Sequence, residues 1–431
     1  MTMRNIHPDE AVRLIVAAAA KAFPSAKTET VRLQDALGRR LTSALVSPID
    51  HPPFDKSAMD GFAYRRSACA DGAPVGIHRV VATIAAGTAV ASRAPLTATR
   101  ALPADAAESS ALRGSDVARI MTGAQLPAGA DAVQRIEWTE PAGQDSGGQQ
   151  LVRFMQDEVL DNIIRRGENL KAGERLMGPR VLAPQDIGIL AAGGIAELEV
   201  AAEPRVVVLS TGDEIQPQGR SLSPAAIYDS NGPQLRAQAA AFGCAAEYWG
   251  IIRDEEAALA GALEKALQAA DIVLVSGGVS MGDFDYVPAV LSRLGVEPIY
   301  HSLAMRPGKP SFFGMRGGTA VFGLPGNPVS TFVNFEVLVK SYIRVATGLD
   351  DGPVVAPARL EKSLERSICD RVEFWPAALH MDGATLCAIP LEYHGSSMIN
   401  VLAFADALLR MEIGQTRLES GETVNARLIR P

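Results

Sequence analysis

Cysteine, histidine and aromatic side chains are scarce in this chain, and their scarcity excludes several classes of site. The four cysteines are Cys69, Cys244, Cys369 and Cys387. They are scattered and include no CxxC pair, so the sequence gives no zinc or iron–sulfur framework and fits a reducing compartment. The six histidines do not cluster either, and we interpret His51, His301 and His394 as structural residues rather than metal ligands.

Long apolar runs and an excess of positive charge are also missing. No uncharged apolar stretch is long enough to span a membrane, and the acids Asp9 and Glu10 precede the first apolar run, unlike in a secretory signal. The net charge of −8 argues against general nucleic-acid binding, and an aromatic content of 5% leaves little for base stacking. We therefore expect a cytoplasmic protein with neither a membrane nor a nucleic acid as partner.

The chain of 431 residues is too long for a single core, and roughly two to four domains are expected. Its composition, 47% hydrophobic and 21% charged, is that of a globular protein. Between residues 204 and 347, strand-like and helix-like segments alternate, which is typical of a mostly parallel sheet covered on both faces. The expected strands are 206–209, 246–252, 272–275, 298–303 and 319–323, and the expected helices are 232–242, 255–269, 287–294 and 329–346.

Residues 271–286, DIVLVSGGVSMGDFDY, are the most informative stretch, because a buried strand runs directly into a glycine loop. After Ser276 the loop holds the small and acidic residues Gly277, Gly278, Ser280, Gly282, Asp283 and Asp285. Glycine lets backbone N–H groups approach anionic oxygens, and acids beside such a loop indicate a divalent cation next to a phosphate. A tight turn with a solvated acidic tip is an equal alternative, because the loop matches neither a Walker A sequence nor GxGxxG.

Two further strand ends favour the ligand site over the simple turn. The strand at 206–209 is followed by STGDE (210–214), and the strand at 320–323 by LPGNP (324–328). Because the carboxyl ends of parallel strands share one edge of a sheet, these residues predict one crevice. Arg306 and Lys309, in the stiff sequence MRPGKP, add fixed cations that suit a phosphorylated ligand with Mg²⁺, or an oxyanion beside one, better than an ordinary surface loop.

The regions on either side carry weaker signals. Residues 8–22 and 183–193 predict helices, 33–41 a short helical piece, and 75–140 an all-β module with 119–124 and 126–131 as strand, turn and strand. Beyond residue 352, short alternating runs at 372–379, 385–389, 407–411 and 423–429 indicate a small barrel or a sandwich. Asp60 by itself predicts a turn cap, and Arg165 with Arg166 a solvated basic edge rather than an anion site.

These motifs as a set resemble the molybdopterin molybdenumtransferase family, which includes the bacterial MoeA proteins and the E domain of gephyrin. The matching pieces, in family order, are FDKSAMDGFA, RIMTGAQLPAGADAV, NIIRRGEN, STGDE, IYDSN, IIRD, SGGVSMGDFDY, MRPGKP, GLPGNPVS and GSSM. The combination of SAMDG, SGGVS, PGKP and LPGNPVS is far more specific than any glycine loop alone. Asn169 and Ser302 stand where the family usually has an Asp and often has a Lys.

The resemblance implies a multidomain α/β protein. Its central domain would be a doubly wound, mostly parallel α/β domain, joined by an all-β module, a helical or extended linker domain and a small C-terminal β-barrel. The expected domains are a discontinuous linker and dimerisation domain at 1–50 plus 151–185, a β-rich module at 51–150, the molybdopterin-binding domain at 186–347 and the barrel at 348–431. The family also implies an elongated homodimer whose site lies between the α/β domain of one copy and the β module of the other.

The resemblance further implies the last step of molybdenum cofactor synthesis: adenylylated molybdopterin is cleaved with Mg²⁺, AMP leaves, and molybdate enters the dithiolene. The expected catalytic residues are Asp60, Thr122, Glu214, Asp254 and Asp285, and Asp254 and Asp285 would bind the metal. The pterin phosphate would bind Ser276, Gly277, Gly278, Ser280, Gly282, Pro325, Gly326, Asn327 and Pro328. Molybdate would bind Arg306, Lys309, Ser330, Arg371 and Ser397.

Molybdopterin adenylyltransferase is the substrate donor that this family relationship implies. Two other functions stay open on the residues alone. One is a catalytically weak protein that binds the cofactor or serves as a scaffold. The other is an enzyme that cleaves a different adenylyl ligand on the same sheet.

Overall fold

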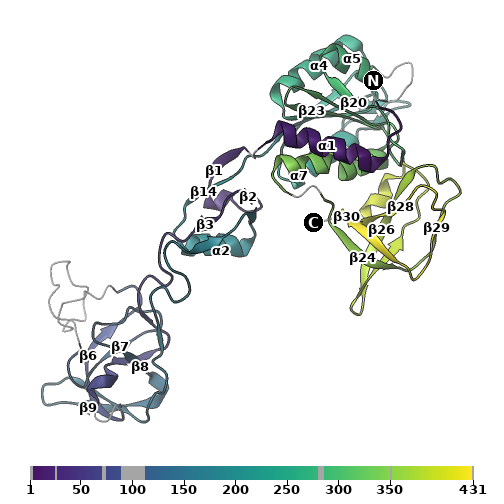
Figure 1. Ribbon diagram of the computed structural model, residues 1–431. Helices are drawn as coiled ribbons and strands as arrows, with labels where there is room; N and C mark the ends of the chain where they lie inside the picture. The colour runs from purple at the N-terminus through teal and green to yellow at the C-terminus, as the bar shows by residue number, and fades with distance from the viewer. Residues whose placement is uncertain are drawn as a thin grey trace. The chain divides into compact units, whose positions relative to one another are not determined.

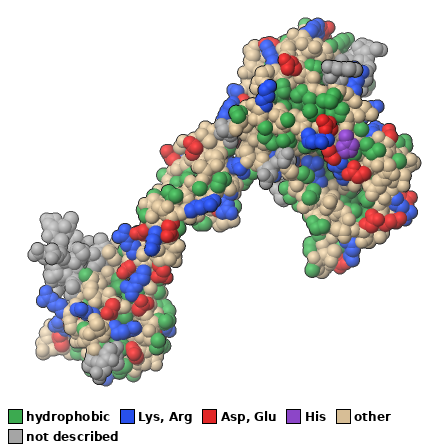
Figure 2. Space-filling view, in the orientation of Figure 1, with side chains coloured by type: hydrophobic (Ala, Val, Ile, Leu, Met, Phe, Trp, Pro, Cys, Tyr) green, Lys and Arg blue, Asp and Glu red, His purple; other side chains and the backbone are tan. Residues whose placement is uncertain are grey.

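The computed structural model describes residues 3–24, 27–69, 74–88, 112–279, 286–349 and 352–429. The chain divides into two compact units, one made of Met1–Thr42 with Leu198–Pro431 and the other of Ser43–Glu197 (Figure 1). Within the described ranges, no helix has both the length and the apolar character needed to cross a bilayer. On the face drawn in Figure 2, basic and acidic side chains are interspersed over each unit. The expected division into four domains stays a prediction.

The larger unit is built on a six-stranded sheet with the strand order β18-β15-β19-β23-β22-β20. Its strands are β15 (Arg205–Thr211), β18 (Ala245–Ile252), β19 (Ile272–Ser276), β20 (Glu297–Tyr300), β22 (Phe312–Arg316) and β23 (Thr319–Leu324). β18, β15, β19 and β23 are parallel, whereas β22 and β20 run antiparallel. The five predicted strands are present. The alternating pattern does not reveal β22, because a two-glycine turn rather than a helix joins it to β23.

Helices cover both faces of this sheet. They are α1 (Pro8–Ala22), α3 (Asn231–Ala241), α4 (Glu256–Ala269), α5 (Val287–Arg293), α6 (Pro328–Asn334) and α7 (Lys340–Ala346), with a π-helical segment, η5 (Phe335–Val339), between the last two. Alternate strand residues enter two cores: Val206 packs with α1, α3 and the helix 328–346, whereas Val207 packs with α4 and α5 (Figure 1). The doubly wound α/β architecture is therefore confirmed.

The first helix shows why its predicted boundaries are right. The His7 side chain accepts a hydrogen bond from the Asp9 backbone N–H at 3.3 Å, and Pro8 occupies the first turn. Asp9 and Glu10 lie near the positive end of the helix dipole. Asp9 also forms a two-point ion pair with Arg410, with N–O distances of 2.7 and 2.8 Å, which fixes α1 to the C-terminal part of the chain.

The C-terminal part is a closed barrel rather than a sandwich. Its strands are β24 (Val355–Leu360), β26 (Val372–Asp382), β27 (Thr385–Pro390), β28 (Ala407–Met411) and β30 (Thr423–Leu428). They pair in the order β26-β27-β24-β30-β28, and β28 pairs again with β26, which closes the ring. Leu360, Ala388, Leu409 and Ala426 fill the interior. The sequence predicts all of these strands except β24.

The barrel continues into the α/β sheet's loops through one short strand. β21 (Met305–Arg306) pairs in parallel with β26, so that Arg306 lies opposite Glu373. The backbone N–H of Val372 also donates to the carbonyl of Ala304 at 3.0 Å. A loop from the sheet and a barrel strand are thereby held in one register.

A small β structure in the larger unit corrects one prediction. It contains β1 (Thr28–Arg32), β2 (Arg40–Leu41) and β14 (Glu197–Ala201), with the 3₁₀ turn η1 (Leu33–Asp35) between the first two. The predicted helical piece at 33–41 is wrong beyond this turn. Gly38, at φ +76°, breaks the helical path, and Leu41 pairs with Val200 instead.

The unit Ser43–Glu197 contains a second six-stranded sheet, in the order β8-β5-β7-β6-β10-β9. Its strands are β5 (Gly61–Tyr64), β6 (Gly76–Ile84), β7 (Asp116–Ile120), β8 (Ala132–Arg135), β9 (Thr139–Gln144) and β10 (Gln150–Phe154). The expected all-β module is thus present. The prediction of a strand at 126–131 is wrong, because this segment turns over Pro127 before β8 begins.

The remaining elements are short. In the second unit they are β3 (Leu45–Val46), β4 (Lys56–Ser57), η2 (Arg66–Ala68), η4 (Ile136–Trp138), β11 (Ile163–Ile164), β12 (Arg175–Met177), β13 (Arg180–Val181) and α2 (Pro184–Ala192). In the larger unit they are β16 (Ile215–Gln216), β17 (Ile227–Tyr228), β25 (Leu364–Glu365), η6 (Ile399–Ala403) and β29 (Arg417–Leu418). The helix α2 agrees with the prediction for 183–193.

Candidate functional site

A cavity of about 1060 Å³ lies in the larger unit where β15, β18, β19 and β23 end. It is lined by the loops that follow these strands, by the 305–310 loop and by residues 371 and 393–399 of the barrel. From the sequence-predicted set it brings together Glu214, Asp254, Ser276, Gly277, Gly278, Arg306, Lys309, Pro325, Gly326, Asn327, Pro328, Ser330, Arg371 and Ser397. Residues nearly 190 positions apart in the chain thus share one cavity.

The glycine loop after β19 cannot carry side chains at two positions. Gly277 has φ +93°, and a Cβ built on it would lie 2.3 Å from the carbonyl oxygen of Thr211. Gly278 has φ +60°, and its Cβ would lie 2.9 Å from Val287. The backbone therefore runs against β15, and both glycines line the cavity without a side chain. Ser280, Gly282, Asp283 and Asp285 lie outside the described residues.

Asn231, the first residue of α3, ties two of these loops together. Its Nδ2 donates to Ser276 Oγ at 2.8 Å and to the carbonyl of Gly326 at 2.7 Å. The side chain is buried, and it lines the cavity. Its motif, IYDSN, is visible in the sequence, but its contacts with loops 45 and 95 residues away are not.

Three carboxylates on the acidic side have different surroundings. Asp254 accepts a hydrogen bond from the Thr211 hydroxyl, and its backbone N–H donates to Asp213 Oδ1 at 3.3 Å. Glu214 is exposed at the cavity lining. Asp229 is buried and accepts from the N–H groups that open α3. It serves as a helix cap, which leaves Asp254 and Glu214 as the available carboxylates among the described residues of the lining.

Tyr248 occupies the second carboxylate oxygen of Asp229, whose first oxygen caps α3. The phenol donates a hydrogen bond to Asp229 Oδ2. Burial, together with this anionic acceptor, raises the pKa of Tyr248 well above its ordinary value, so the tyrosine stays protonated and the bond persists. The loop that carries Asn231 is thereby fixed against β18.

The opposite side of the cavity is cationic. Arg306 lies 3.2 Å from Glu373, a carboxylate with only 1% of its side chain exposed. Glu373 also pairs with Arg366 at 3.3 Å, and Arg366 in turn donates to the carbonyl of Arg371 at 2.8 Å. The buried Glu373 carboxylate thus holds the Arg306 side chain directly, and Arg366 joins Glu373 to the backbone of Arg371.

Lys309 differs from both arginines. Its side chain is exposed at the cavity, and it forms no ion pair with any carboxylate in the described ranges. The backbone beneath it is rigid: Gly308 has φ +100°, and a Cβ there would lie 1.9 Å from Asn334. An unpaired ammonium on a fixed loop is suited to receive an anion.

Tyr393 is a cavity residue that the sequence does not single out. It is buried, and its ring meets Trp375 edge-on with the centroids 5.4 Å apart. Burial raises the pKa of Tyr393 to about 12, so its phenol is neutral at physiological pH. No local pattern marks this residue, because its neighbours come from a barrel strand 18 residues away.

Asp60 and Thr122 lie together in the unit Ser43–Glu197. Asp60 Oδ1 accepts from the Thr122 backbone N–H at 2.7 Å and from its hydroxyl at 2.8 Å. These bonds, the backbone one first, lower the pKa of the exposed Asp60 carboxyl. The expected proximity of these two residues is therefore present, and Asp60 stays ionised at physiological pH.

Arg165 and Arg166 are ion-paired within the same unit. Arg165 meets Asp161 at 2.7 Å, and Arg166 meets Asp50 at 2.5 Å. With 47% and 67% of their side chains exposed, the two arginines agree with the prediction of a solvated basic edge. Of the two positions that depart from the family, Ser302 accepts a backbone hydrogen bond from Asn5 at 2.7 Å, and Asn169 donates its N–H to His51 at 3.0 Å.

Known proteins match this chain along nearly its whole length. Residues 6–194 match the family model of the MoeA N-terminal region (domain I and II), residues 207–345 that of the probable molybdopterin binding domain, and residues 341–429 that of the MoeA C-terminal region (domain IV). A relative from Bacillus subtilis (strain 168), named molybdopterin molybdenumtransferase, is 34% identical over 411 residues, covering 94% of this chain and 90% of the relative. A protein of the same name from Staphylococcus aureus (strain Mu50) is 32% identical and covers 92% and 90%.

A solved structure agrees with these matches. The crystal structure of a molybdopterin biosynthesis MoeA protein from Pyrococcus horikosii has a TM-score of 0.79 with this chain at 29% identity, covering 99% of this chain and 100% of that one. The fold and the cavity define a multidomain protein of the molybdopterin-binding type. The chain belongs to the MoeA family of molybdopterin molybdenumtransferases.

Proposed function

We propose that this chain is a cytoplasmic molybdopterin molybdenumtransferase that inserts molybdate into adenylylated molybdopterin, with Mg²⁺-dependent release of AMP. The observation that carries the proposal is one cavity of about 1060 Å³ with a glycine loop, free carboxylates and fixed cations on its walls. The glycine loop suits the phosphate of a nucleotide-linked pterin, and the carboxylates suit a Mg²⁺ ion that assists cleavage of a phosphoanhydride. The cations suit an entering oxyanion.

The phosphate-binding part of the proposed site is backbone. Ser276 ends β19, and Gly277 and Gly278 follow it; Pro325, Gly326 and Asn327 join β23 to α6, which begins at Pro328. Their polar main-chain groups can bind the pterin phosphate without a charged side chain. Ser280 and Gly282 belong to the same proposed set.

The acidic part of the proposed site supplies hard oxygen donors. Thr211 occupies one oxygen of Asp254, which leaves the other oxygen of this partly exposed carboxylate for a ligand, and Glu214 lies in the same lining. Carboxylate oxygens are the ligands that Mg²⁺ prefers, so Asp254, with Asp285 as its proposed partner, fits the ion. When bound, Mg²⁺ would neutralise phosphate charge during cleavage. Thr211 would hold Asp254 in orientation.

The cationic part of the proposed site accepts molybdate, which is a substrate. Arg306, Lys309 and Arg371 would supply charge, and the hydroxyls of Ser330 and Ser397 would supply donors; all five line the cavity. A doubly charged tetrahedral oxyanion is bound best by donors that do not have to be ordered first. The ion pair with Glu373 orders Arg306 in this way.

We further propose that the active form is a homodimer in which Asp60 and Thr122 act on substrate bound to the other copy, with molybdopterin adenylyltransferase as the donor. Complementation tests the dimer. Asp60→Ala and Asp254→Ala chains, each inactive alone, should regain about a quarter of wild-type AMP release when mixed after unfolding and refolding, because only mixed dimers hold an intact site. If each inactive chain stays inactive in the mixture, Asp60 acts within its own copy or not at all.

A single-turnover assay with purified full-length protein and adenylylated molybdopterin tests the reaction. AMP release that requires Mg²⁺ and rises with molybdate supports the proposal. AMP release that is indifferent to molybdate would instead favour an enzyme acting on another adenylyl ligand. Tight substrate binding without release would favour a cofactor-binding or scaffold protein.

A further inference from the structure

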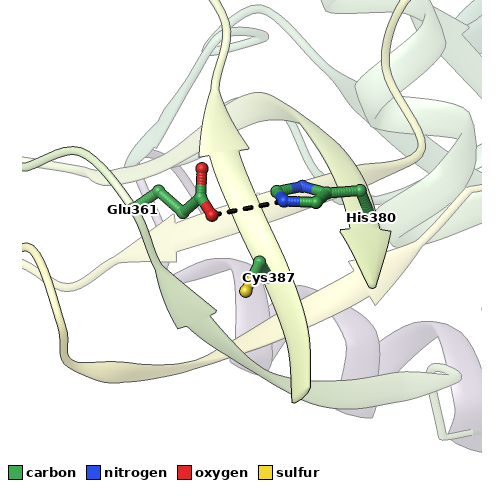
Figure 3. Close-up of side chains that lie close together, drawn as sticks. All are labelled: Glu361, His380 and Cys387. Carbon is green, nitrogen blue, oxygen red and sulfur yellow. Dashed lines mark ion pairs between the residues drawn. The ribbon is translucent and has the colours of Figure 1, made fainter. Parts of the chain in front are cut away.

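Four side chains gather on the outer face of the C-terminal barrel, away from the cavity. Three neighbouring strands set them in register: Arg359 of β24 lies opposite Cys387 of β27, and Cys387 lies opposite His380 of β26. Glu361 follows Arg359 by two residues and therefore belongs to the same side of its strand (Figure 3). The residues between them, Leu360 and Ala388, belong to the barrel interior.

The potential ligand atoms of three of these residues lie close together. His380 Nε2 and Glu361 Oε1 are 3.2 Å apart, and these atoms and Cys387 Sγ all lie within 4.8 Å of one another. Figure 3 shows the imidazole and the carboxylate pointing toward each other above the strand that carries Cys387. Atoms that share a tetrahedral zinc ion lie about 3.3–3.8 Å apart, so a small rotation of the cysteine side chain would complete the set.

Cys387 is buried in an unusual setting for a thiol. It has no exposed surface, yet it belongs to the outward side of the sheet rather than to the apolar core. Its Sγ accepts a hydrogen bond from Arg359 Nη2 at 3.3 Å. Buried free cysteines generally pack as small hydrophobic residues, whereas this one is surrounded by guanidinium, imidazole and carboxylate groups. A metal ion binds cysteine as the thiolate and displaces the thiol proton when it binds.

The charge of the cluster suits a divalent cation. Arg359 is itself paired with Asp382 at 2.7 Å, so its positive charge is already balanced. A metal ion that displaces the Cys387 thiol proton would meet two anionic ligands, Cys387 and Glu361, and the imidazole nitrogen of His380. His380 and Glu361 have 44% and 32% of their side chains exposed, which leaves an open path from solvent.

We propose that Glu361, His380 and Cys387 form a binding site for a divalent transition-metal ion of the zinc class. Thiolate, imidazole and carboxylate together are typical zinc ligands, and a thiolate is a poor ligand for Mg²⁺. Three protein ligands leave a fourth position for water or for a side chain of another molecule. The site is separate from the Mg²⁺ of the proposed reaction, because none of its three ligands lines the cavity.

Cobalt is the probe, because Co²⁺ occupies zinc sites and reports its ligands by absorption. Full-length protein, stripped with a chelator, is titrated with Co²⁺ in the presence of excess Mg²⁺. We expect one equivalent to bind with at least micromolar affinity, to give a sulfur-to-cobalt charge-transfer band with tetrahedral ligand-field bands, and to be displaced by one equivalent of Zn²⁺.

Variants assign the ligands. Cys387→Ser should abolish the sulfur band, and His380→Gln and Glu361→Gln, at partly exposed positions that tolerate substitution, should each weaken Co²⁺ binding at least about tenfold. Cys369→Ser, which removes a thiol from a neighbouring loop of the same barrel, and Asp254→Ala, which alters the cavity, should leave the titration unchanged. A sulfur band that survives in Cys387→Ser, or wild-type protein with no such band, would overturn the proposal.

Discussion

The two sides of the cavity are built on different principles. On the side of the sheet, loops at the strand ends line the cavity, and Gly277 and Gly278 leave no room for side chains. On the side of the barrel, long cationic side chains approach it, and a buried carboxylate, Glu373, holds one of them. Backbone positions a phosphate by shape, whereas paired side chains position an oxyanion by charge. Substitutions on the two sides should therefore affect different properties, namely stability on the side of the sheet and dependence on molybdate on the side of the barrel.

Glycine substitution should give the largest effect. Gly277→Ala places a Cβ against the Thr211 carbonyl at a positive φ, so the free energy of unfolding should fall by about 3 kcal/mol or more. The matched change Gly326→Ala, where the new Cβ meets nothing within 4 Å, should alter it by less than about 0.5 kcal/mol. Urea denaturation of both variants measures this difference. Equal stabilities would mean that the loop can move away from β15.

Removing the buried charge of Glu373 should give the second largest effect. Glu373→Gln leaves Arg366, which is 4% exposed, without its carboxylate, and the free energy of unfolding should fall by about 3 kcal/mol. The molybdate concentration for half-maximal AMP release should also rise, because Arg306 loses its partner. Glu365→Gln, at an exposed pair with Arg417, is the control and should change stability by less than about 0.5 kcal/mol. Unaltered molybdate dependence in a folded Glu373→Gln protein would separate Glu373 from the site.

Lys309 sharpens the comparison, because it is a cation without a described partner. Lys309→Ala should raise the molybdate concentration for half-maximal AMP release about tenfold, through loss of one charge-assisted contact. Binding of the pterin substrate should change by less than about twofold. Lys362→Ala, on the barrel and outside the cavity lining, is the control. If the variant lost affinity for molybdate and for the pterin substrate equally, the assignment of Lys309 to the molybdate site would be wrong.

The smallest effect concerns Asp60, where the carboxylate depends on one threonine. Thr122→Val removes the hydroxyl but keeps the backbone N–H, so the pKa of Asp60 should rise part of the way toward its ordinary value. Because hydrogen bonds to the ionised form lower the pKa of Asp60, losing one of them should let the carboxylate become protonated at a higher pH in the variant than in the wild type. Carbon-13 NMR titration of Asp60 measures the change, with Thr139→Val as the control, since that hydroxyl donates to Ile136 instead.

The sequence predicts the parts of the site that local chemistry dictates. A buried strand followed by Ser-Gly-Gly predicts a close backbone turn, because glycine adopts positive φ. In Met-Arg-Pro-Gly-Lys-Pro, the two prolines restrict the backbone that carries Arg306 and Lys309. The same local logic gives the helix at 8–22 and the parallel strands, because their caps and apolar runs are contiguous.

The sequence does not predict contacts that depend on the assembled fold. Glu373 and Tyr393 matter because the barrel places them beside the 305–310 loop, which no spacing reveals. Likewise, His380 and Cys387 are seven residues apart and match no metal-binding spacing. They meet only because a hairpin sets them opposite each other. The inference that the cysteines give no zinc framework rests on their spacing, and spacing does not show which side chains a hairpin brings together.

The parallel pairing of β21 with β26 has a consequence for how the chain can be divided. A fragment that stops at the end of α7 would keep the glycine loop and Asp254, but it would lose both the strand that holds the 305–310 loop and the carboxylate that holds Arg306. Such a fragment would still carry the elements proposed to bind a phosphate, but the proposed oxyanion site would be incomplete. In this chain the barrel forms one wall of the cavity. A barrel fused to another α/β sheet would complete such a cavity only if the pairing of β21 with β26 were kept in the same register.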